Sequence, residues 1–180
     1  RCKQGAKGDY MSVWWALYQP ASFSIDNTGN SALGTKNDFV RMCNAAHKYG
    51  IYVIVDVVAN HMGDNGSNQK SPAIIDALEN DPSCWHDISK NISNYYNRYD
   101  ITHYCMDGVP DLNTGSTKVQ TYVLNFVKEC IDAGADGFRF DAAKHIETPD
   151  DAWGTSSEFW PTVVNGAKSY AKSKRGIELY

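Results

Sequence analysis

Residues 51–58 read IYVIVDVV, and all but Tyr52 and Asp56 in this run are β-branched. Near-continuous runs of this kind are typical of strands covered on both faces, as in parallel sheets. Upstream, Thr35 is a good N-cap, and apolar residues recur at helical spacing from there to a stop at Gly50. We therefore expect a helix over 35–50 that leads into a strand over 51–58, with both faces of the strand covered.

The same alternation continues on both sides of this unit. Further strands are expected at 11–15, 137–141 and 177–180, a loop at 18–34, and helices from 119 to a stop at Gly134 and over about 159–173. This order predicts parallel βαβ units. A Rossmann-type sheet and a (β/α)8 barrel both fit, but no G-x-G-x-x-G motif follows a strand, which disfavours the dinucleotide-binding sheet.

Residues 59–113 interrupt the alternation. The segment is polar and contains Gly, Pro, Asn and Asp throughout. It is far longer than the roughly 2–6 residues that usually follow a strand in an α/β unit. It is therefore either a functional excursion or a small inserted domain.

Composition excludes some classes of partner. The 180 residues are 42% hydrophobic and 21% charged, which is ordinary for a globular protein. A net charge of -4 argues against nucleic acid as a partner, and no run approaches the roughly 20 apolar residues that span a bilayer. The chain opens on Arg1 and ends at Tyr180 inside an apolar run, from which we expect an internal fragment of a longer protein.

The five cysteines give a weak signal. They show no C-x-x-C spacing, which disfavours a zinc site. Cys84 and Cys105 fall in one loop-like region and could form a disulfide in an oxidising compartment.

Polar residues gather where the strands are expected to end. Asp56 and the pair Asn60-His61 accompany one strand, and Asp141 and the pair Lys144-His145 accompany another. A barrel enzyme builds its active site from these carboxyl ends.

Alternation along residues 137–141 puts Arg139 and Asp141 on one face of the strand. The arginine favours the ionised carboxylate that a nucleophile requires. Taken alone, the same residues could be a buried ion pair with Asp56, and His61 could be an exposed imidazole in a loop turn.

Four segments together resemble the α-amylase family. Residues 56–61 (DVVANH) resemble its first signature, and residues 137–145 (GFRFDAAKH) resemble its nucleophile signature. Residues 110–113 (PDLN) resemble the motif near the end of the family's inserted domain B, and residues 14–20 (WWALYQP) the segment with its sugar-stacking tyrosine. The resemblance implies an α/β fold: a partial (β/α)8 TIM barrel of about four strands, with an irregular domain B inserted after the third barrel strand. The implied divisions are barrel at 1–58, domain B at 59–113 and barrel at 114–180.

The resemblance also implies a role for individual residues. Asp141 would be the nucleophile, Arg139 would orient it, and Asp56 would support both. The residues implied in substrate binding are Tyr18, Gln19, His61, Lys144 and His145. The residues implied in binding Ca²⁺ are Asn60, Thr102, Asp111 and, through its backbone carbonyl, His145.

The implied activity is retaining endo-hydrolysis of α-1,4-glucosidic bonds in starch-type glucans, by a secreted protein that is a monomer at full length. Such hydrolysis also needs an acid/base carboxyl group. In the family this is a Glu at the carboxyl end of the strand after the nucleophile's, so we expect it beyond Tyr180 and expect the fragment alone to be inactive. Glu178 lies at the beginning of its strand and is interpreted as structural. The alternatives are a transglycosylase, an α-1,6 debranching enzyme or a non-catalytic glucan-binding relative.

Overall fold

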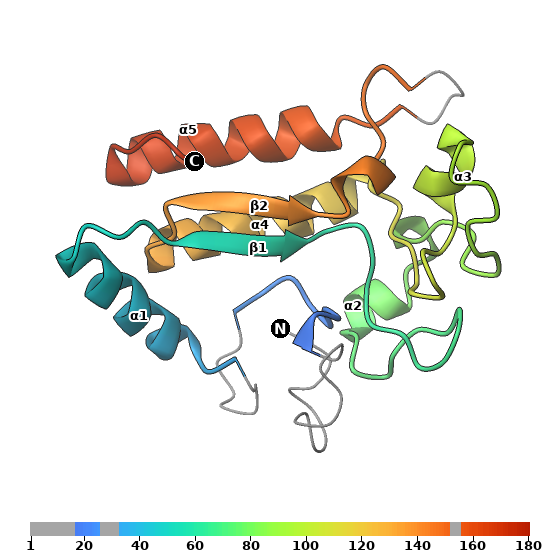
Figure 1. The fold of residues 1–180 in the computed structure, drawn as a ribbon, viewed down its shortest axis with the longest axis horizontal. Helices are drawn as coiled ribbons and strands as arrows, with labels where there is room; N and C mark the ends of the chain where they lie inside the picture. The colour runs from blue at the N-terminus through green and yellow to red at the C-terminus, as the bar shows by residue number, and fades with distance from the viewer. Residues whose placement is uncertain (1–16, 26–32, 152–155) are drawn as a thin grey trace.

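Two parallel strands form the centre of the molecule in the computed structural model, which describes residues 17–25, 33–151 and 156–180. Strands β1 (Ile54–Val58) and β2 (Gly137–Asp141) pair in register, from Ile54 opposite Gly137 to Val58 opposite Asp141. Both strands point toward the side of the molecule that contains α2 and α3 (Figure 1). The expected strand at 11–15 and residues 14–16 of the expected tyrosine segment lie outside the described residues.

The three expected helices are present, with slightly different ends. Helix α1 (Lys36–Lys48) begins with a capping box between Thr35 and Asp38. Helix α4 (Thr117–Ala133) ends at Gly134, whose φ of 116° explains the glycine. Helix α5 (Gly166–Arg175) follows a π-helical turn, η5 (Pro161–Asn165). The helical periodicity was therefore a reliable guide to these elements.

Only one face of the two-stranded sheet is covered within the described ranges. Val57 is fully buried in a core that includes Val123 and Val127 of α4. On the opposite face, the side chains of Asp56 and Arg139 are 52% and 57% exposed. The expectation that both faces are covered is therefore wrong for this structure. The strand also begins at Ile54 rather than at residue 51.

The expected strand at 177–180 is not formed as a strand, but its last residue already pairs with the sheet. The Tyr180 N–H donates to the Asp136 carbonyl, and the Phe138 N–H donates to the Tyr180 carbonyl, both at 3.1 Å. These bonds place residue 180 beside the amino end of β2. Two backbone bonds at one residue are too few to define a strand.

The segment between β1 and α4, residues 59–113, is irregular, as expected. We call it the excursion. It contains only short helices, α2 (Asp76–Glu79), η3 (Pro82–Cys84) and α3 (Arg98–His103), together with isolated bridges. Its two ends are joined where the Leu112 N–H donates to the Asn60 carbonyl at 2.8 Å and the Met62 N–H to the Pro110 carbonyl at 3.0 Å. The excursion therefore leaves and re-enters the sheet region at one neck.

The possible Cys84–Cys105 disulfide is not formed. Both residues are buried free thiols, as are Cys43 and Cys130. Cys84 lies in η3, whereas the backbone of Cys105 pairs with Lys90. The two cysteines therefore belong to different parts of the excursion. None of the helices in the described ranges is long and apolar enough to cross a membrane.

Candidate active site

Arg139 joins Asp56, in the middle of β1, to Asp141, at the carboxyl end of β2. One guanidinium nitrogen, Nη1, lies 2.6 Å from Asp141 Oδ1 and 2.9–3.0 Å from both oxygens of Asp56. The pairing register explains the contact, because Asp56 lies directly opposite Arg139 and Asp141 is two residues further along the same face. These hydrogen bonds, first to Asp56 and then to Asp141, raise the pKa of Arg139. The ion pair with Asp56 that the alternative expected is therefore present, but it is not buried within the described structure.

His61 lies just beyond β1 and is buried, with 6% of its surface exposed. Burial lowers the pKa of its imidazole to about 4, and the nearby charge of Asp141 only partly opposes this. His61 is therefore neutral at neutral pH. Its Nδ1 atom is buried and has no hydrogen-bond partner among the described residues. The alternative of an exposed imidazole in a loop turn is wrong.

The loop after β2 brings Lys144 and His145 together at one tyrosine. Ala142 adopts a left-handed conformation, with φ 49°, and turns the chain into the short helix η4 (Ala143–His145). The edge of the Tyr95 ring meets the His145 ring at a centroid distance of 6.3 Å, and Lys144 Nζ lies 5.4 Å from the centre of the Tyr95 ring. Burial lowers the pKa of His145, whose Nδ1 is 2.8 Å from the Ile101 carbonyl. Tyr95, which sequence reasoning missed, therefore links the excursion to this loop.

Arg98 of α3 fixes the same loop from the other side. Its guanidinium donates to the carbonyls of Lys144 and Ile146 and, through Nε and Nη2, to both carboxylate oxygens of Asp151 at 2.8 and 2.7 Å. This bidentate contact lowers the pKa of Asp151 to about 2, chiefly through the hydrogen bond to Arg98. No sequence motif had singled out Arg98, whose partners follow it by roughly fifty residues.

Tyr18 and Gln19 lie in different environments although they are adjacent. Tyr18 is 64% exposed and lines a pocket of about 350 Å³ together with Asp56. Gln19 is buried, and its Nε2 donates to Asp64 Oδ1 at 2.6 Å. The Gln19 Oε1 atom is buried without a hydrogen-bond partner in the part of the chain that the structure describes. The exposed Tyr18 ring can stack on a ligand, whereas the Gln19 amide binds Asp64 of the excursion.

Asn60 and Asp111 meet at the neck, fifty-one positions apart in the sequence. The Asn60 Nδ2 donates to Asp111 Oδ1 at 3.0 Å, and both side chains are 1% exposed. The Asn60 Oδ1 atom is buried and lacks a partner within the described ranges. Burial raises the pKa of Asp111 to about 7. An unpartnered amide oxygen beside a buried carboxylate oxygen suits a hard cation, which would satisfy the first and stabilise the charge of the second.

The second oxygen of Asp111 leads to a polar cluster that sequence reasoning missed. His86 Nδ1 lies 2.7 Å from Asp111 Oδ2, and His86 Nε2 lies 3.0 Å from Glu147 Oε1. Burial disfavours the imidazolium, but the hydrogen bonds to Asp111 and Glu147 outweigh that effect and raise the pKa of His86 to about 9. Thr102, expected at the cation site, directs its hydroxyl to the Arg98 carbonyl at 2.9 Å and to His103 Nδ1 at 2.8 Å.

A family model and two curated relatives connect this chain with α-amylases. The family described as "Alpha amylase, catalytic domain" matches residues 27–173. The α-amylase of Clostridium acetobutylicum is 42% identical over 168 residues, which are 89% of this chain and 21% of that protein. The α-amylase of Butyrivibrio fibrisolvens is 41% identical over 77% of this chain and 14% of that protein.

Solved structures that match this chain include α-amylases and, at 23% identity with a TM-score of 0.66, a cyclomaltodextrin glucanotransferase. The α-amylase of Geobacillus thermoleovorans, solved with acarbose, matches with a TM-score of 0.61 and 28% identity over 76% of this chain and 27% of its own. The α-amylase I of Eisenia fetida matches with a TM-score of 0.67 over 93% of this chain and 34% of its own, at 23% identity, which shows a shared fold. This chain spans about a fifth or less of the length of the two curated relatives.

Proposed function

Because this chain belongs to the α-amylase family and matches its catalytic domain, which has a TIM-barrel fold, we propose that it forms part of a retaining endo-hydrolase of α-1,4-glucosidic bonds in starch-type glucans. The observation that carries the proposal is the triad of Asp56, Arg139 and Asp141, which extends along one face of two adjacent parallel strands to the carboxyl end of β2. This is the end of the sheet where barrel enzymes hold their catalytic groups. We also propose that the two strands belong to a partial barrel, with the excursion as its inserted domain B.

In the proposed reaction the Asp141 carboxylate attacks the anomeric carbon and forms a glycosyl-enzyme, which water then hydrolyses. Arg139 orients the attacking carboxylate through the 2.6 Å contact, and Asp56 holds Arg139 in place. Both carboxylates of the triad are occupied by Arg139, so we assign neither of them the role of acid toward the leaving group. The acid/base carboxyl group therefore comes from another residue, which we expect outside this chain.

Glu178 does not fit the role of the acid. Its carboxylate is 79% exposed and pairs with Lys172 at 2.8 Å, and it lies close to Tyr180, which pairs with the amino end of β2. It therefore lies at the end of the sheet opposite to Asp141. Because it lies far from the triad, Glu178 is a suitable control when the carboxylate of Asp141 is removed.

The remaining substrate contacts are proposed from their positions. The exposed Tyr18 ring would stack on a sugar, since it shares a pocket with Asp56. The neutral His61, together with Lys144 and His145, would hydrogen-bond the sugar hydroxyls beside Asp141. Gln19 would act indirectly, because its amide is buried and bound to Asp64.

Members of the family commonly depend on calcium, and we propose that Ca²⁺ is held by the side-chain oxygens of Asn60 and Asp111 and by the backbone carbonyls of Thr102 and His145. The buried oxygen of Asn60 supports this set. Thr102 lies in the last turn of α3, where helix carbonyls lack intrahelical partners. Bound there, the ion would supply structural charge neutralisation between the excursion and the loop after β2. Secretion is proposed as well, since polymeric starch is too large to enter a cell. The monomeric state stays a prediction.

The test is Asp141→Asn in the protein at its natural length, with Glu178→Gln as the matched control. Loss of a covalent nucleophile should lower kcat on soluble starch by a factor on the order of 10⁴, while substrate binding by the inactive protein persists. The control should keep wild-type kcat. If the Asp141→Asn protein retains a tenth of wild-type kcat, the triad is structural and the proposal is wrong.

Product analysis separates the alternatives. Release of short α-1,4 oligosaccharides with a retained anomeric configuration supports the hydrolase. Cyclic or lengthened products would indicate a transglycosylase, cleavage confined to α-1,6 branch points would indicate a debranching enzyme, and glucan binding without any cleavage would indicate a non-catalytic relative.

A further inference from the structure

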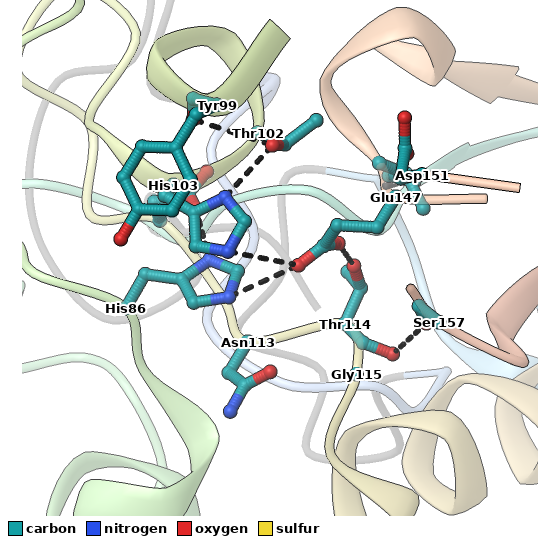
Figure 2. Close-up of polar contacts among 12 residues, drawn as sticks. His86, Tyr99, Thr102, His103, Asn113, Thr114, Gly115, Glu147, Asp151 and Ser157 are labelled. Carbon is teal, nitrogen blue, oxygen red and sulfur yellow. Dashed lines mark hydrogen bonds and ion pairs between the residues drawn. The ribbon is translucent and has the colours of Figure 1, made fainter. Parts of the chain in front are cut away.

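Two histidines of the excursion meet a glutamate from the segment that follows β2. His86 follows η3, His103 ends α3, and Glu147 lies just after η4 (Figure 2). Glu147 Oε1 lies 3.0 Å from His86 Nε2 and 4.0 Å from His103 Nε2. The three candidate ligand atoms all lie within 4.8 Å of one another. None of these three residues belongs to the proposed catalytic triad or to the proposed calcium ligands.

We propose that His86, His103 and Glu147 form a binding site for a zinc ion, separate from the calcium site. Zinc takes histidine nitrogens and carboxylate oxygens at about 2.0–2.2 Å in a tetrahedron, so its ligand atoms are roughly 3.4 Å apart. The separations of 3.0 and 4.0 Å lie on either side of that value. Shifts of less than about 1 Å would complete the geometry.

Each ligand is also held by its other polar atom, as zinc ligands usually are. His86 Nδ1 lies 2.7 Å from Asp111 Oδ2, and the ion would take the place of the proton that Nε2 now shares with Glu147 Oε1. His103 Nδ1 lies 2.8 Å from the Thr102 hydroxyl. Glu147 accepts a hydrogen bond at Oε2 from the Thr114 hydroxyl, which leaves Oε1 facing the two rings.

Stacking fixes the plane of the central ring. The His103 ring lies between Tyr99, at a centroid distance of 4.2 Å, and His86, at 4.4 Å. Figure 2 shows this stack with the Glu147 carboxylate at its edge. Because the rings cannot turn freely, both Nε2 atoms stay directed toward the carboxylate, and the site is largely formed before an ion arrives.

Three protein ligands leave the fourth position of a tetrahedral ion open. The cluster lines a polar pocket of about 670 Å³, whose walls also include Ser83, Asn113 and Ser116. Water or another small ligand can reach the ion from this pocket. The bound ion would join the excursion to the loop that carries Lys144 and His145, so zinc would tighten that loop.

The proposal is tested by zinc binding to the protein at its natural length, stripped of metal and then saturated with Ca²⁺. We expect calorimetry to detect one class of zinc site that His103→Gln and Glu147→Gln each weaken at least a hundredfold. His47→Gln is the matched control, because His47 is a half-buried histidine bound to Asp136 at the other end of the sheet, and it should bind zinc as the wild type does. Thr114→Val, which removes only the hydroxyl that orients Glu147, should weaken binding about 10–100-fold.

Two further readouts separate loss of ligands from loss of fold. Calcium-dependent melting of His103→Gln should match that of the wild type, and Co²⁺ should give the strong visible absorption of a four-coordinate ion in the wild type but not in His103→Gln. Zinc affinity of His103→Gln within threefold of wild type would overturn the proposal. So would the absence of zinc binding to the calcium-loaded wild type. Starch hydrolysis plays no part in this test, so its result is independent of the proposed function.

Discussion

Replacing Arg98 with Met should destabilise the protein by about 2–4 kcal/mol. Methionine keeps the length of the side chain but removes the bidentate pair with Asp151 and the donors to two loop carbonyls. The pKa of Asp151 is lowered from 3.8 to about 2, which at 1.36 kcal/mol per pKa unit is worth about 2.4 kcal/mol; Arg98 supplies the largest part of this and hydrogen bonds from Thr148 the rest. The side chains are 24% and 12% exposed, so solvent screens the pair only modestly. The lost carbonyl bonds supply the remainder.

The pH dependence of the difference in unfolding free energy between wild type and Arg98→Met shows whether the pair with Asp151 causes it. A carboxyl group with a lowered folded-state pKa contributes its full stability above the unfolded value of 3.8 and loses it as the pH falls through 2. The gap in unfolding free energy between wild type and Arg98→Met should therefore be constant from pH 7 to about 5 and narrow below about 3.8.

Urea unfolding at several pH values measures this gap. Arg41→Met is the control, because Arg41 is 79% exposed and solvent should screen its pair with Asp38 almost completely. Looser positioning of Lys144 and His145 should also lower kcat. A gap below about 0.5 kcal/mol at pH 7, or one that stays unchanged at pH 2.5, would contradict the assignment of stability to the Arg98–Asp151 contact.

Three other substitutions test features of the fold and the site. Thr35→Ala should cost about 1 kcal/mol in thermal unfolding and Thr35→Ser much less, because only the alanine removes the capping hydroxyl of α1. Gly134→Ala should cost about 1–3 kcal/mol by urea unfolding, since a Cβ at φ 116° would lie 2.7 Å from the Cβ of Cys43; an unchanged midpoint would contradict this reading. Asp111→Ala should abolish the fall in melting temperature that a chelator causes in the wild type, a loss of about 2.7 kcal/mol at calcium a hundredfold above Kd. If its melting still responds to chelator, Asp111 is not a ligand.

Local patterns predicted the elements and the triad well. The β-branched run ending at Val58 and the alternation ending at Asp141 gave both strands, and alternation alone put Arg139 and Asp141 on one face. Gly134 marked the end of α4 because the left-handed backbone conformation at that position favours glycine. These features depend on neighbours within a few residues, which a sequence displays directly.

The features that were missed depend on contacts between distant segments. Arg98 reaches residues 46–53 positions later, and His86 meets Glu147 although neither lies in a periodic element. The expectation about the face of β1 was wrong for a related reason. A run of β-branched residues indicates a strand, but what covers each face depends on other elements of the barrel, and one face is open in the part of the chain described.

The neck of the excursion has a consequence for the order in which the chain folds. Residues 58 and 137 are roughly 80 positions apart, and closing so long a loop before β1 and β2 pair carries a large entropic cost. Once Asn60 and Leu112 are hydrogen-bonded, the free path between the strands shortens to roughly 27 residues, which lowers that cost by about 1 kcal/mol. The excursion should therefore close before the central sheet forms. Weakening the neck should slow refolding more than it speeds unfolding.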